Sequence, residues 1–128
     1  MKTKATAWLF VALLALVSLP AMAAEWYENG TLHDKSGLEW QDASYANKLA
    51  TAGDFVATAY QRDRLAPRIS SRISDVDDMR PLAEELVNQL NDVFAPHPDA
   101  ATSKALSNQK VNETAAMLMV MMDWLDFN

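Results

Sequence analysis

Apolar residues recur every three or four positions along most of the chain, which is the period of an α-helix with one buried face. The pattern is clearest over residues 79–94, where the opposite face carries acidic and amide side chains. The apolar face of this stretch consists of Met79, Leu82, Leu86, Leu90 and Val93. We therefore predict an all-α protein, a small helical bundle of three long helices and one short helix with an extended N-terminal arm.

The first long helix is predicted over residues 37–64. Ser36 and Glu39 have the spacing of a capping box, in which each side chain satisfies a free backbone N–H. The apolar stripe that follows on a helical wheel comprises Leu38, Tyr45, Leu49, Ala52, Val56 and Tyr60. Trp40 points away from this stripe. A break near Ser44 would free Trp40 to pack elsewhere, so one helix and two helices both stay open.

A short helix is predicted over residues 65–74, where Pro67 suits a first helical turn. Asp75, Asp77 and Asp78 come next and supply a cap and negative charge for the N-terminus of the helix over 79–94. These acids do not resemble a calcium loop, because Arg80 and Leu86 stand where an EF-hand needs Gly and Glu.

The last helix is predicted to begin at Thr102 or Ser107 and to end near Leu125. Its residues 115–122 are eight consecutive apolar residues. A helix that is apolar around much of its circumference belongs in the middle of a bundle. At the other end of the chain, residues 25–35 contain the turn signal Asn29-Gly30 and are predicted to form the extended arm.

Residues 1–23 have the organisation of a secretory signal peptide. Lys2 and Lys4 precede an uncharged apolar run, and Pro20 precedes the cleavage pattern Ala21-Met22-Ala23. The run is too short to cross a bilayer as a helix, which needs about 20 apolar residues. We therefore predict export to the periplasm or the extracellular medium, with residues 24–128 forming one helical domain.

Charge and cysteine content narrow the possible partners. Loss of Lys2 and Lys4 would reduce the basic residues from 11 to 9 against 17 acidic residues, a formal charge of −8. Such a balance opposes nucleic acids and anionic membrane surfaces. The chain has no cysteine, which excludes a disulfide framework. Five of the nine basic residues are arginines between positions 62 and 80, a run that is a candidate for docking an anionic partner.

The methionines of the last helix suggest a copper site as an alternative function. Thioether sulfur is a soft ligand that suits Cu(I), and Met117 and Met121 are one turn apart. The further ligands available to such a site are Met79, His33 and His97. Helix geometry allows at most two of the clustered methionines to reach one ion, so core packing is the favoured role for this group.

No sequence motif indicates catalysis or a bound cofactor. His33 beside Asp34 and His97 near Asp99 could act as acid–base pairs, but no nucleophile motif accompanies them. A C-x-x-C-H haem attachment motif is absent as well. A hydrolase whose site is assembled from loops remains an alternative that the sequence does not resolve.

We therefore predict a binding or accessory module without intrinsic catalysis or a cofactor. On a helical wheel, Met117, Met121 and Trp124 share a second face of the last helix, about 120° from its core face. A small bundle offers few neighbours to cover both faces. These three residues are the candidate contact for a protein partner or for a homodimer.

Overall fold

The computed structural model of the protein describes residues 23–128, so nearly all of the expected signal peptide lies outside the described residues. The prediction of an all-α fold is confirmed, because the described part contains helices and only two isolated β-bridges. No helix of this part is long and apolar enough to span a bilayer. The elements in chain order are α2 (Gly37–Gln41), α3 (Tyr45–Gln61), α4 (Pro67–Ser70), the 3₁₀-helix η1 (Val76–Met79), α5 (Arg80–Phe94), α6 (Ala100–Ser107) and α7 (Val111–Met121).

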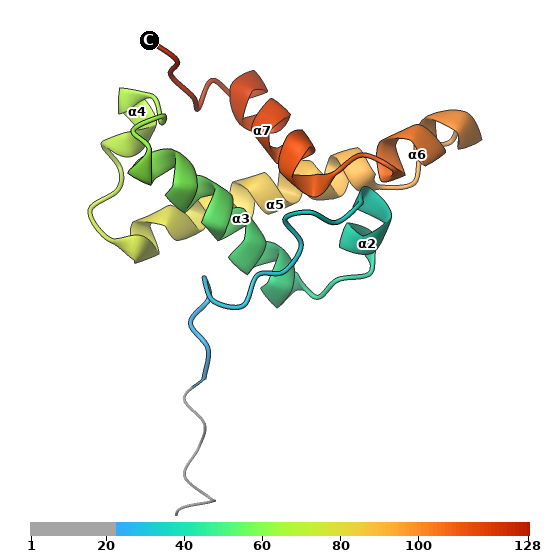
Figure 1. Cartoon of the computed structure of the whole chain (residues 1–128), viewed down its shortest axis with the longest axis horizontal. Helices are drawn as coiled ribbons and strands as arrows, with labels where there is room; N and C mark the ends of the chain where they lie inside the picture. Colours follow the sequence, from blue (N-terminus) through green and yellow to red (C-terminus); the bar gives the residue numbers. More distant parts are fainter. Residues whose placement is uncertain (1–22) are drawn as a thin grey trace, which may run out of the picture.

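Helix α5 occupies the centre of the bundle. It packs against α2, α3, α6, α7 and η1, and Figure 1 shows it crossing behind α3 and α7. Two adjacent faces of α5 are buried. The sequence indicated the face of Leu82, Leu86 and Leu90, and the structure adds a second buried face with Ala83 and Val87. The expectation that the last helix would lie in the middle of the bundle is wrong. The outer face of α7 is in solvent, because only one side of it packs on the core.

The region predicted as one helix over residues 37–64 forms two, with the break that the sequence left open. The Ser36–Glu39 capping box starts α2, and Ser44 caps α3 by accepting a hydrogen bond from the backbone N–H of Asn47. Because the turn rotates α2 relative to α3, Trp40 points into the core. Its side chain is fully buried, and its Nε1–H donates a 2.9 Å hydrogen bond to Asn91 Oδ1.

The structure corrects both ends of the predicted stripe. Leu49, Ala52 and Val56 are buried as expected. Leu38 lies in α2 and is 57% exposed, because the break before α3 removes it from the stripe. Tyr45 is 53% exposed in the first turn of α3. Tyr60 is also exposed, in the last turn of α3.

The predicted last helix is likewise two helices, α6 and α7, separated at residues 108–110. The N-terminal arm enters this gap: Gly37 N–H donates to Gln109 O at 2.9 Å, and Val111 N–H donates to Lys35 O at 2.9 Å. Helix α7 also ends four residues earlier than expected. Met122 is its C-cap, and Asp123 adopts a positive φ of 60°, which turns the chain out of the helix.

Two glycines permit close packing between elements. A Cβ on Gly53 would lie 2.8 Å from the Trp26 ring, so the arm can rest on α3 only because position 53 has no side chain. A Cβ on Gly37 would collide with the Phe94 ring at the end of α5. The contact with Trp26 explains why Gly53, a residue type that disfavours helix, occurs in the middle of α3.

Candidate ligand-binding groove

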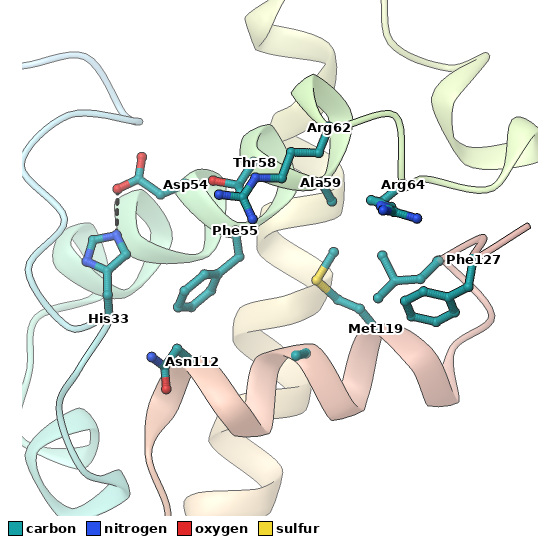
Figure 2. A pocket seen from close by; sticks show the side chains of 12 residues that line it. His33, Asp54, Phe55, Thr58, Ala59, Arg62, Arg64, Asn112, Met119 and Phe127 are labelled. Atoms are coloured by element: carbon teal, nitrogen blue, oxygen red, sulfur yellow. Dashed lines mark hydrogen bonds and ion pairs between the residues drawn. The ribbon is translucent and has the colours of Figure 1, made fainter.

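A groove with a volume of about 1010 Å³ lies between α3 and α7 (Figure 2). Its two long walls are the facing sides of these helices. The side of α3 and its C-cap residue contribute Asp54, Phe55, Thr58, Ala59 and Arg62, which recur at helical spacing. The side of α7 contributes Asn112, Ala116 and Met119. A volume of this size is at the upper end of the range for ligand-binding cavities.

The N-terminal arm forms one end of the groove. Its backbone is fixed to α3, because Thr31 N–H donates to Asn47 Oδ1 at 2.9 Å and Leu32 N–H donates to Thr51 Oγ1 at 3.3 Å. On the other side, Asn112 N–H donates to the carbonyl oxygen of His33 at 3.1 Å. The arm therefore bridges the two helices and places the His33 side chain in the groove.

The C-terminal tail forms the opposite end. Leu65 and Leu125 pair in an isolated antiparallel bridge, with hydrogen bonds of 2.7 Å from Ala66 N–H to Trp124 O and from Asp126 N–H to Arg64 O. The bridge brings Leu125 and Phe127 to the groove next to Arg64. Each end of the groove is thus bounded by a segment that is held by hydrogen bonds to residues far away in the chain.

The end formed by the arm is polar. His33 Nε2 lies 2.7 Å from Asp54 Oδ2, and the imidazole meets the Phe55 ring edge-on with centroids 5.4 Å apart. A carboxylate oxygen accepts, so the hydrogen bond requires the His33 tautomer in which Nε2 is the donor. A hydrolytic site would also need a hydroxyl or thiol hydrogen-bonded to the imidazole. Within residues 23–128, no hydroxyl hydrogen-bonds to the His33 ring.

The middle of the groove is apolar. Phe55 and Ala59 of α3 face Met119 of α7. Leu125, which pairs with Leu65, adds a further apolar side chain to the lining. Met119 is 3% exposed, so most of its side chain belongs to the core and only its edge borders the groove.

Two arginines line the groove on the side of α3, and Arg64 stands at the end formed by the tail. Arg62 and Arg64 are exposed, and the Arg62 side chain in Figure 2 reaches back along α3 towards Thr58. Neither has a carboxylate within ion-pair distance among the described residues, where the salt bridges are His33–Asp54 and Arg80–Glu84. The arginine run noted in the sequence is therefore divided, and only its first two members belong to the groove.

The structure separates the three residues that the sequence placed in a partner contact. Met117 and Met121 are 45% and 72% exposed on the outer face of α7. Trp124 is only 6% exposed, because α7 ends before it and the chain turns the indole into the core. Met117 and Met121 thus share a solvent-facing surface that does not include Trp124.

The structure also places the candidate copper ligands on different elements. Met79 is buried in η1, and His97 lies in the loop after α5, where its Nδ1 accepts a hydrogen bond from Asp99 N–H at 3.0 Å. Helix α5 separates these two residues by about 22 Å at 1.5 Å per residue. His33 lies in the groove. The described residues contain no group of three or more His, Asp or Glu side chains positioned to hold a metal ion.

Sequence reasoning missed most of the groove. Asp54 and Phe55 attracted no attention, because an acid and an aromatic residue on an amphipathic helix have no distinctive spacing. Comparisons with protein-family models, characterised proteins and solved structures found no match to this chain.

Proposed function

We propose that the protein is a binding or accessory module without catalysis of its own, exported to the periplasm or the extracellular medium, and that its partner binds in the groove between α3 and α7. The observation that carries this proposal is the juxtaposition of an apolar groove and the cations Arg62 and Arg64, which have no carboxylate within ion-pair distance among residues 23–128. A concave apolar surface with a few polar groups at its ends is the usual form of a binding site.

The openness of the groove favours a segment of a protein over a fully enclosed small molecule. Thr58 and Ala116 on its rim are exposed, and Phe127 is 66% exposed. A ligand lying against these residues would keep its opposite face in water. Protein segments with one apolar face bind in this manner.

The proposed function is tested by placing a photo-crosslinking amino acid at Ala116, on the rim of the groove. The matched control carries the same amino acid at Ala101, which is exposed on α6 away from the groove. We expect a crosslinked partner in the native host from position 116 and not from position 101. Equal labelling at both positions, or none at position 116, would contradict the proposal.

Filling the groove provides an independent test. Ala116→Trp adds a large side chain to an exposed rim position, so the fold should be retained while the groove is obstructed. We expect this variant to lose the partner identified by crosslinking. Export is tested separately by the intact mass of the secreted protein, which should begin at Ala24 or Glu25.

A further inference from the structure

We infer that the occupant of the groove is a short amphipathic helix of a partner protein, with carboxylate side chains at the end that lies against Arg62 and Arg64. This inference rests on the proposed function and specifies the chemistry of the partner.

The length of the groove fits two turns of helix. Asp54 and Arg62 mark its two ends on α3 and are eight positions apart, which corresponds to ~12 Å along the helix axis. A ligand helix of about eight residues covers the same distance. It would present apolar residues at positions i, i+3 or i+4, and i+7 to Phe55, Met119 and Leu125.

The charges of the groove define the orientation of this ligand. Arg62 and Arg64 are exposed cations with no carboxylate partner in the described part of the chain, whereas Asp54 at the other end already pairs with His33. Guanidinium groups bind carboxylates through paired N–H donors. Acidic residues of the ligand are therefore favoured beside the arginines, and they are disfavoured beside Asp54.

The acidity of the whole protein does not cancel this local attraction. Electrostatic interactions between exposed groups are screened over about 8 Å at physiological ionic strength. The ligand carboxylates would contact Arg62 and Arg64 well within that distance. The remaining acidic surface instead opposes other acidic partners that do not reach the two arginines.

Two synthetic helical peptides of twelve residues test the inference. Both carry the same apolar face, and one has two Glu residues in its final turn where the other has two Lys residues. We expect the Glu peptide to bind the purified protein at least about fivefold more tightly by isothermal titration calorimetry, a difference of ~1 kcal/mol. The preference should decrease as the salt concentration rises.

The Arg62→Gln, Arg64→Gln double variant should lose this preference while retaining its circular dichroism spectrum. The matched control is Arg72→Gln, Lys104→Gln, which removes two exposed cations that do not line the groove. The control should retain the preference. Equal binding of the two peptides, or a preference that survives in the Arg62, Arg64 variant, would overturn the inference.

Two further outcomes would assign the groove to another occupant. Binding of decanoate that depends on Arg62 and Arg64, without binding of the Glu peptide, would identify a small anionic amphiphile as the ligand. A dimer in sedimentation that is dissociated by Ala116→Trp would identify a second copy of the chain. Both results overturn the helix inference, whereas the proposed function falls if position 116 crosslinks no partner or is labelled no more than position 101.

Discussion

Leu65 and Leu125 pair in an antiparallel bridge that joins the chain after α3 to the chain after α7. A single arginine reinforces this connection. Arg68 Nη2 donates to Met122 O at 2.9 Å and to Asp123 O at 2.6 Å, where the carbonyl groups at the end of α7 lack helical partners. The cationic end of the groove therefore depends on contacts that fix the tail to the α4 region.

We predict that Arg68→Ala will lower the free energy of unfolding by about 1 kcal/mol, the net value of a typical hydrogen bond, since the guanidinium is exposed. Chemical denaturation measures the change, and hydrogen exchange should increase at Asp126, whose N–H donates across the bridge. Arg72→Ala is the control, because Arg72 has no side-chain hydrogen bond or ion pair within residues 23–128. Equal effects of the two substitutions would show that Arg68 does not hold the tail.

The break between α2 and α3 predicts opposite consequences for two neighbouring residues. Trp40→Ala should destabilise the protein by about 3–5 kcal/mol, since it removes a fully buried indole and leaves Asn91 without its donor. Leu38→Ala should cost less than ~0.5 kcal/mol, because Leu38 is 57% exposed. Urea denaturation compares the two variants. A larger cost at Leu38 would mean that the region forms one continuous helix.

The parts of the fold that could be predicted from sequence are those determined by neighbouring residues. The capping box of Ser36 and Glu39, the buried face of α5 and the buried centre of α3 follow from local spacing. The break after Gln41 was visible only as a misplaced Trp40. The buried position of Trp40 depends on its hydrogen bond to Asn91, which is distant in sequence and could not be read from local spacing.

The groove could not be predicted because its ends are long-range backbone pairings. Ser36 pairs with Lys110 and Leu65 pairs with Leu125, and neither pairing has a hydrophobic pattern that specifies it. The division of α6 from α7 has the same cause, since the arm inserts between them. Without these pairings, His33 and Arg64 appear in the sequence as unrelated polar residues.

Acid should release the cap of α6. Hydrogen bonds from the Thr102 side chain and backbone N–H, at 2.6 Å and 3.0 Å, hold the pKa of the Asp99 carboxyl below its ordinary value of 3.8. Because the pKa is lower in the folded state, the stabilisation is present above pH 3.8 and is lost as the pH falls through the folded-state pKa. Helix α6 has no fully buried residue, so its capping contributes much of its order.

An NMR titration of the Asp99 carboxyl should therefore show a midpoint below 3.8, and Thr102→Val should move the midpoint upward. The amide protons of α6 should exchange faster with solvent once Asp99 is protonated. A midpoint at or above 3.8 in the unsubstituted protein would contradict the proposed capping interaction.

The last prediction separates the buried and exposed residues that the sequence had grouped in one partner contact. Trp124 is 6% exposed, and Trp124→Glu would place an unpaired charge in the core, so we expect a loss of at least ~3 kcal/mol of stability. Met121 is 72% exposed, and Met121→Glu should change stability by less than ~0.5 kcal/mol.

If the outer face of α7 contacts a partner or a second copy, Met121→Glu will weaken association in sedimentation while the protein stays folded. Thermal unfolding of both variants provides the check on the fold. A stable, folded Trp124→Glu protein would show that the indole is accessible and would return Trp124 to the contact surface with Met117 and Met121.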